Sequence, residues 1–242
     1  MKLSLLASSV LFALLAGCAP EGDHTRAAEP APAPESHEPT APVAAPAAPK
    51  KLLPTHVEAA QASLTTLGHL AIADKTLGFR SPEEATSATL GSPLPMFMVG
   101  LNPLRAYRAG DDPRALLLSE GSVFYPVTVN GEVRSSVLVR QDAAGGGWKA
   151  SQFGRPTLAS LASAERANLA HARKVTESGV SLVEIPTLSA RMLEHEENGV
   201  PMLTSLLDVP GTDIHAGETR SAADVFTKLQ PVAARLQDMR PN

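Results

Sequence analysis

The chain contains one cysteine, Cys18, among its 242 residues. Because no thiol follows it, thiol catalysis and thiolate metal sites are excluded from the folded part of the protein. Aromatic residues make up only 4% of the chain. A hydrophobic core must therefore be built mainly from leucine, valine, alanine and methionine.

The sequence has no excess of positive charge and no familiar catalytic motif. Its formal net charge is -4, and lysine and arginine form no block with interleaved aromatic residues, which argues against nucleic-acid binding. The chain has no P-loop, no dinucleotide-binding glycine pattern, no nucleophile elbow and no zinc-binding His-Glu helix. No repeat at a fixed period is present. These absences leave the common nucleotide-binding and hydrolase classes without support.

No apolar run is long enough to predict a lasting transmembrane helix. The longest, Leu3 to Leu15, follows the positive Lys2 and falls short of the ~20 residues that a membrane-spanning helix needs. A positive residue, a short apolar run and small residues after it are typical of a secretory signal peptide. The sequence therefore predicts export.

The residues after this run are Leu15, Ala16, Gly17 and Cys18. They resemble the lipobox of bacterial lipoproteins, and the resemblance is confined to this N-terminal segment. It implies that residues 1–17 are a signal peptide removed before Cys18, and that Cys18 carries the lipids that attach the protein to a membrane of the cell envelope. Ala19 stands where aspartate often favours inner-membrane retention in that family, which implies the outer membrane.

Residues 18–51 are rich in proline and alanine. Proline interrupts helix and sheet hydrogen bonding, and alanine offers too little apolar area to offset the entropy of ordering, so a disordered tether is expected. At ~3.1 Å per residue its extended reach is on the order of 100 Å. The folded domain is thus expected to act well away from its lipid.

Residues 52–242, about 190 residues, are long enough for one domain with a substantial core. Helical spacing and capping patterns predict helices over 55–74, 82–90, 157–179 and 221–236. Thr55 and Glu58 form a capping box, and Pro231 is expected to kink or interrupt the last helix.

Strands are expected between these helices. The segment 122–140 reads as a hairpin around Asn130-Gly131, for which we predict a three-residue loop that places the valines and Tyr125 on one face. Further strands are expected over 148–153, 180–185, 188–194 and 200–207, with 94–99 as an edge strand because of Pro95. Short connections favour antiparallel pairing, so the prediction is an α+β fold with a single antiparallel sheet and helices packed mainly on one face.

Arginines near this hairpin are candidates for binding an anionic ligand or a partner. Arg134 and Arg140 fall on its polar face, while Arg105 and Arg108 lie in the preceding segment. Such arginines also serve simply to keep a sheet face hydrated. If the face with Thr128, Arg134, Ser136 and Arg140 is uncovered, we expect it to be the partner-binding surface.

Acidic residues and histidine gather at a second candidate site. The loop around Pro210-Gly211 carries oxygen and nitrogen ligands that suit calcium or a transition metal: Asp208, Asp213, His215 and Glu218. Their spacing matches no known metal-binding loop, so a polar connection is the simpler interpretation. The acidic run that contains His195 and Glu196 reads as a solvated hairpin tip. No cofactor is expected.

Three functions remain open. The favoured one is a lipid-anchored accessory protein that binds an envelope protein or the cell wall through its tethered domain. A small envelope hydrolase or metal-dependent enzyme would require His195, Glu196, Asp213 and His215 to converge in one cleft. A small-ligand sensor or carrier would require an apolar pocket between the sheet and the helices.

Overall fold

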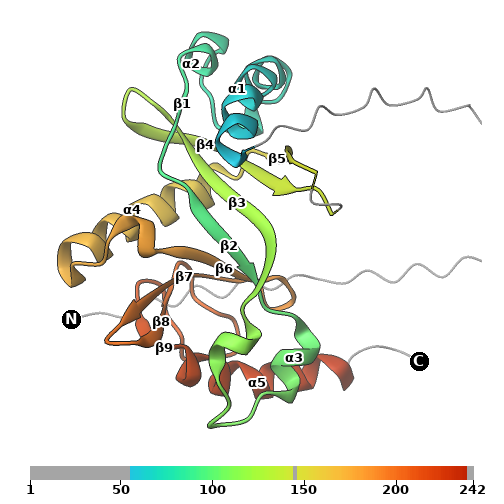
Figure 1. Cartoon of the computed structure of the whole chain (residues 1–242), viewed down its shortest axis with the longest axis vertical. Helices are drawn as coiled ribbons and strands as arrows, with labels where there is room; N and C mark the ends of the chain where they lie inside the picture. The colour runs from blue at the N-terminus through green and yellow to red at the C-terminus, as the bar shows by residue number, and fades with distance from the viewer. Residues whose placement is uncertain (1–54, 144–145, 239–242) are drawn as a thin grey trace, which may run out of the picture. The chain divides into compact units, whose positions relative to one another are not determined.

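The computed structural model describes residues 55–143 and 146–238 (Figure 1). The predicted signal peptide at 1–17, the predicted lipidation of Cys18 and the expected tether at 18–51 lie outside the described residues. The described residues belong to one compact unit. Within the described ranges, no helix combines the length and the hydropathy of a membrane span.

A nine-stranded sheet forms the framework, in the order β5-β4-β3-β2-β6-β7-β8-β9, with β1 paired to β3. All pairs are antiparallel except β2 with β6. The strands are β1 (Thr89–Leu90), β2 (Leu94–Met98), β3 (Leu118–Val129), β4 (Glu132–Gln141), β5 (Trp148–Phe153), β6 (Ser181–Ile185), β7 (Ala190–Glu197), β8 (Val200–Ser205) and β9 (Thr219–Ser221).

Helices pack against the sheet at several places. The described ranges also contain four 3-10 turns between these elements: η1 (Lys75–Leu77), η2 (Pro113–Leu116), η3 (Glu177–Gly179) and η4 (Pro186–Leu188). The α-helices are α1 (His56–Ala73), α2 (Pro82–Thr86), α3 (Leu101–Ala106), α4 (Pro156–Arg173) and α5 (Ala222–Asp238). The α+β class predicted from the sequence is therefore confirmed.

Side-chain alternation divides the core between the two faces of the sheet. Val123 packs with α1 and α2, whereas its neighbour Phe124 packs with α4. On β7, Met192 packs with α5 and Leu193 with α4. Neighbouring strand residues point to opposite faces, so α1, α2, α3 and α5 share one face and α4 covers the other. The expectation of helices mainly on one face needs this correction.

Figure 1 shows α1 and α2 at one end of the sheet and α3 and α5 at the other. The sheet face with Ser136 and Arg140, expected to be a partner surface if uncovered, is the face that α4 covers, and Ser136 is only 2% exposed. That condition is therefore not met. The apolar Phe124 and Leu138 on the same face explain why α4 packs there.

The β3–β4 hairpin differs from the predicted register. Asn130 and Gly131 form a two-residue turn with positive φ at both positions, and Val129 pairs directly with Glu132. A β-bulge then restores the apolar face, because Val127 pairs with Ser135 while Thr128 pairs with Val133. Val133 lies with the α4 cluster instead of on the predicted face. The other five members of that face are confirmed: Val123, Tyr125, Val127, Val137 and Val139.

Strand β2 is central rather than an edge, which corrects the inference from Pro95. Pairs with β6 begin only at Met96, so the missing N–H of Pro95 lies outside that ladder. The parallel pairing of β2 and β6 is possible because the long segment between them, which contains α4, crosses back over the sheet.

Local signals were accurate at the starts of α1 and α2. Thr55 and Glu58 make the predicted capping box, and Ser81 caps α2 through the Glu84 N–H. Helix α5 continues through Pro231 to Asp238. Helix α3 was not predicted, because the segment with Arg105 was expected to be a loop.

Candidate functional site

The predicted arginines have different surroundings in the structure. Arg105 Nε donates to the Ala233 carbonyl oxygen at 2.9 Å, so this arginine holds α3 to α5. Arg140 donates to Ser122 Oγ at 3.1 Å and to Glu120 Oε2 at 2.9 Å. Arg108 is exposed, and its backbone N–H donates to an Asp111 carboxylate oxygen. These three arginines are not brought together at one site.

The proposed metal ligands are engaged by local partners, although His215 Nδ1 lies 3.5 Å from Asp208 Oδ1. Asp208 accepts from the Ala216 N–H, and Glu218 accepts from the His215 N–H and from Arg220. Asp213 is bound by Lys228 at 2.9 Å, which lowers the pKa of that aspartate. In residues 55–143 and 146–238, no three His, Cys, Asp or Glu side chains are grouped as a metal site requires.

The residues of the hydrolase hypothesis do not converge either. His195 is fully buried and contacts Glu197 at 2.9 Å, while Glu196 binds Arg114. His195 and Glu196 are neighbours on β7, so their side chains lie on opposite faces of the sheet. Asp213 belongs to the separate cluster with Lys228. The condition set for this hypothesis is not met.

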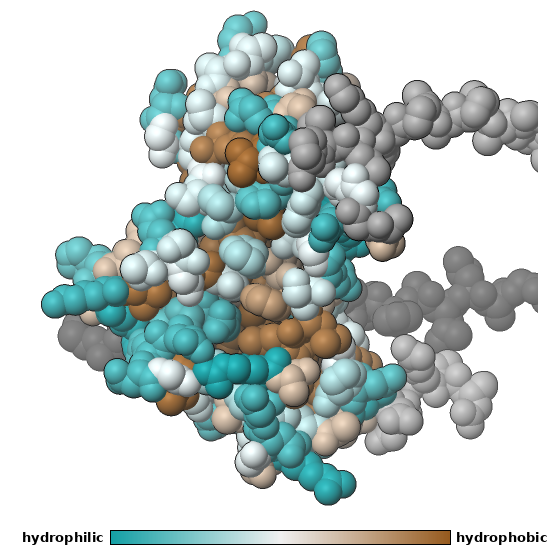
Figure 2. Space-filling model, viewed as in Figure 1, coloured by the Kyte–Doolittle hydropathy of each residue, from teal (hydrophilic) through white to brown (hydrophobic). Residues whose placement is uncertain are grey.

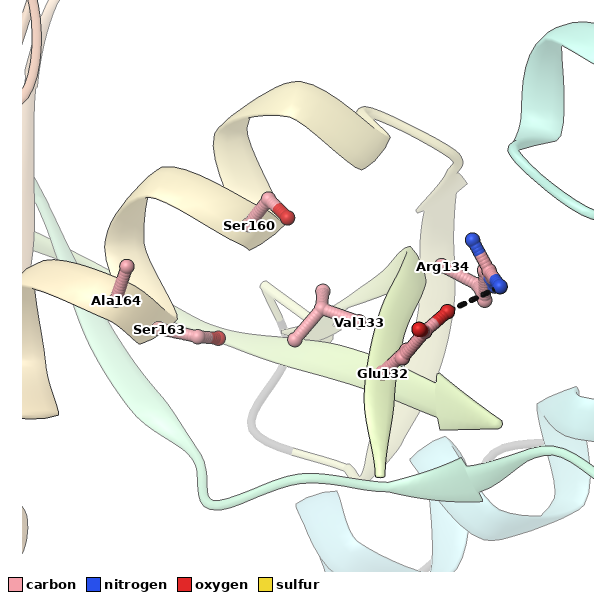
Figure 3. Close-up of a pocket in the computed structure, with 6 residues that line it drawn as sticks. All are labelled: Glu132, Val133, Arg134, Ser160, Ser163 and Ala164. Carbon is pink, nitrogen blue, oxygen red and sulfur yellow. Dashed lines mark hydrogen bonds and ion pairs between the residues drawn. The ribbon is translucent and has the colours of Figure 1, made fainter. Parts of the chain in front are cut away.

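Arg134 is the predicted arginine that lines a cavity. Two adjoining cavities of about 510 and 390 Å³ lie between the start of β4 and the first half of α4, and both include Val133, Arg134 and Ser160. We call this region the Arg134 groove; its lining residues are Gly78, Glu132, Val133, Arg134, Pro156, Thr157, Ser160, Leu161, Ser163 and Ala164. Figure 3 shows Ser160 and Ser163 pointing from α4 toward the strand with Val133 and Arg134.

The β-bulge brings two successive strand residues to this groove. In a regular strand, Val133 and Arg134 would point to opposite faces. Here Arg134 is the extra residue, since Val133 pairs with Thr128 and Ser135 with Val127. Figure 3 shows the Val133 side chain directed toward α4 and the Arg134 side chain directed away from it, beside Glu132.

The backbone at this bulge is tightly packed. Gly78 ends η1 with φ +95°, and a Cβ on Gly78 would lie 1.9 Å from the Arg134 carbonyl oxygen. Only glycine permits this approach, because any side chain would overlap the strand. The close packing fixes the position from which the Arg134 side chain extends.

Two carboxylates lie near the guanidinium of Arg134. Its Nη2 contacts Glu132 Oε2 and lies 3.9 Å from Glu84 Oε1. The Arg134 side chain is 16% exposed, whereas that of Glu132 is 63% exposed.

Two polar atoms of the groove lack the partners that buried polar atoms normally have. Within the part of the chain that the structure describes, the buried Arg134 Nε and Ser163 Oγ have no hydrogen-bond partner. An unsatisfied buried polar group costs about 1–3 kcal/mol. Such groups call for an explanation, and a ligand that supplies the missing partners is one.

A further cavity of about 420 Å³ lies between α1 and α2, where Leu64, Ile72 and Ala85 contribute apolar surface. It also has exposed hydrophobic neighbours, since Ile72 is 63% exposed and Leu70 42%. Elsewhere, hydrophobic residues gather near the middle of the face shown in Figure 2, with hydrophilic residues around them. Neither surface displays charged or hydroxyl groups arranged as in the Arg134 groove.

Comparison with known proteins leaves the geometry of this groove as the guide to function. No protein-family model, no curated protein and no solved structure matches the chain.

The sequence analysis named Arg134 as a candidate but did not predict the hydroxyl-bearing residues of α4 that line the same groove. Thr157, Ser160 and Ser163 recur at a spacing of three along α4, which places hydroxyls on one side of a helix. That spacing was visible in the sequence. The bulge at Arg134 was not visible, because the predicted register had no irregularity at that point.

Proposed function

We propose that this chain is a lipid-anchored binding protein of the bacterial cell envelope, and that its α+β domain binds a ligand in the Arg134 groove. The motif from Leu15 to Cys18 supports the lipid anchor. The proline-rich segment after it supports a domain tethered at a distance from the membrane. The groove supports binding rather than catalysis, because its lining residues include no base beside a nucleophile.

The observation that carries the binding function is the state of Arg134. Arg134 lines an open cavity, its Nη2 contacts Glu132 and lies 3.9 Å from Glu84 Oε1, and its Nε has no partner among the described residues. A guanidinium presents its N–H groups as a planar fork that matches two oxygens of one anion. Glu132 uses one edge of that fork incompletely, so the groove retains capacity for an external anionic group.

Metabolic labelling with a palmitate analogue tests the anchor. The full-length chain, expressed in a bacterium, should incorporate the lipid and sediment with outer membranes. Cys18→Ser should abolish both the labelling and the cleavage before residue 18 that produces the mature N-terminus. Labelling that persists in Cys18→Ser would contradict the proposed anchor.

Capture from a cell-envelope extract tests the binding function. The full-length chain should retain a reproducible envelope component, and Arg134→Gln should lose it. Arg140→Gln is the matched control, because Arg140 lies on the same strand but binds Glu120 and Ser122 outside the groove. Equal capture by the parent chain and by Arg134→Gln would reject the groove as the binding site.

A further inference from the structure

We propose that the cavity between α1 and α2 binds an uncharged, elongated small molecule that is apolar along one side and carries hydroxyl or amide groups along the other. Figure 1 shows α1 and α2 together at one end of the sheet. We call this cavity the α1–α2 groove; its lining residues fall within 61–72 and 82–88, and it shares none of them with the Arg134 groove. It is therefore a second site, and its occupation does not require the function proposed for Arg134.

Helix α1 presents two parallel rows of residues to this groove. Residues four apart lie on the same side of a helix, one turn after another. This spacing gives an apolar row and a polar row: Leu64, Gly68 and Ile72, and Gln61, Thr65 and His69. Each row extends for about 12 Å at 1.5 Å per residue, which favours an elongated ligand.

The wall opposite α1 is apolar and uncharged. Pro82, Ala85 and Ala88 contribute its apolar surface, and Thr86 adds a hydroxyl. Ala85 is only 4% exposed, whereas Ile72 is 63% exposed at the rim. Among the described residues that line the groove, none is lysine, arginine, aspartate or glutamate. Because burial of a charge without a partner is costly, this lining selects an uncharged ligand.

The polar row is available for hydrogen bonding with a ligand. In the ranges that the structure describes, the side chains of Gln61, Thr65 and His69 make no hydrogen bond to the protein. Each of these three side chains, with the imidazole neutral, both donates and accepts a hydrogen bond. Hydroxyl and amide groups of a ligand match that capacity, since they also donate and accept.

Gly68, in the middle of the apolar row, is the residue that points to an external occupant. Glycine is among the least favourable residues in a helix interior. The fold does not require it here, because its φ is not in the left-handed region and a Cβ would lie 3.9 Å from the Ala85 carbonyl oxygen and 4.0 Å from Ala85 Cβ, which are ordinary contacts. The glycine instead leaves space in the groove, whose volume of about 420 Å³ is in the range of small-molecule sites.

Fluorescence titration tests the site with two probes that share one ring system. N-phenyl-1-naphthylamine is neutral and has one N–H donor, and 8-anilino-1-naphthalenesulfonate is its anionic counterpart. The protein is the full-length chain with Cys18→Ser, prepared without detergent so that no micelle competes for the probe. We expect saturable binding of the neutral probe, at least about ten-fold tighter than that of the anionic probe, because no cation lines the groove to pair with the sulfonate. Equal binding of the two probes, or no saturable binding of the neutral probe, would overturn the proposal.

Gly68→Ala separates a role in binding from a role in the fold. Alanine favours the helix and meets only ordinary contacts, so Tm should rise. The added methyl group also occupies the groove, so the neutral probe should bind about three-fold or more weakly. A higher Tm with unchanged probe binding would contradict the proposal. A lower Tm would also contradict it, because the fold itself would then require the glycine.

Ile72→Glu locates the probe in the groove without disturbing the core. It should weaken binding of the neutral probe about ten-fold or more, since it replaces apolar surface at the rim by a charge. Leu118→Glu is the matched control, because Leu118 is also exposed, at 49%, but lies on β3 outside the groove. Equal effects of the two substitutions would reject the α1–α2 groove as the site.

Sedimentation velocity on the same samples distinguishes a small molecule from a second copy of the chain. We expect the parent chain and Ile72→Glu to sediment alike. A parent dimer that Ile72→Glu dissociates would show that the groove is an interface between two copies, and the small-molecule ligand would be rejected.

Discussion

Replacing Gly78 by alanine should destabilise the domain strongly, since this glycine meets the bulge that carries Arg134. Gly78 has φ +95°, a conformation that residues with a side chain rarely adopt. An added Cβ would also lie 1.9 Å from the Arg134 carbonyl oxygen and 2.9 Å from Pro156 Cβ. The first neighbour is backbone, so it cannot move aside by a simple side-chain rotation.

The two penalties have separable magnitudes. A left-handed backbone conformation costs a residue with a Cβ about 1–2 kcal/mol. Overpacking adds about 1–3 kcal/mol, so the free energy of unfolding of Gly78→Ala should fall by about 2–5 kcal/mol. For a domain of this size, each kcal/mol lowers Tm by about 2–4 °C.

Gly131→Ala isolates the conformational penalty. Gly131 also has a positive φ, +81°, but a Cβ there would meet nothing within 4 Å. Urea denaturation of both variants, followed by circular dichroism, should therefore show a larger loss of stability for Gly78→Ala. If the two variants lose the same free energy of unfolding, the predicted backbone collision does not govern this position and the account of the bulge is wrong.

Three further substitutions test the core and the charges of β7. Burial raises the pKa of Glu194, and the negative charge of Glu196 adds to this effect, so the charged form of Glu194 opposes folding. Glu194→Gln should therefore stabilise the domain at pH 7. In urea titrations this gain should vanish below pH 4.5, the ordinary pKa of glutamate. Hydrogen bonds from His195 and Arg173 lower the pKa of Glu197; Glu197→Gln should therefore destabilise at pH 7, with the difference lost as pH falls through the lowered pKa, and a constant difference would contradict this linkage. Phe226 is fully buried against Tyr107, and Phe226→Ala should cost about 3–5 kcal/mol in thermal or urea unfolding, whereas the same truncation at an exposed leucine should stay within about 0.5 kcal/mol.

The sequence predicted those elements whose signals are local. A helix start depends on a few adjacent side chains, and Thr55 and Ser81 make the caps that their positions indicate. Strand β5 has the predicted bounds, Trp148–Phe153, because a glycine run and a buried valine strand precede it. Short turns likewise predicted the antiparallel pairs.

Long-range pairing could not be read from the same signals. Pro95 suggested an edge because proline lacks an N–H, but the position of β6 beside β2 depends on how α4 crosses the sheet. The placement of α4 on the opposite face follows from the second apolar stripe of the hairpin, which includes Phe124 and Leu138. The alternation of residues along the hairpin includes that stripe, but the predicted apolar face was chosen from the valines and Tyr125.

The candidate site arises from a conflict between two local requirements. Asn130-Gly131 favours a two-residue turn, whereas the valines of β3 and β4 need a register shifted by one residue to share a face. The chain satisfies both by placing an extra residue in β4, and that residue is Arg134. The bulge that preserves the hydrophobic core thus also places Arg134 at the border of the groove, beside Glu132. A variant that removed the conflict, such as deletion of Arg134, should retain the sheet while losing the groove, so stability and ligand binding would separate at this single position.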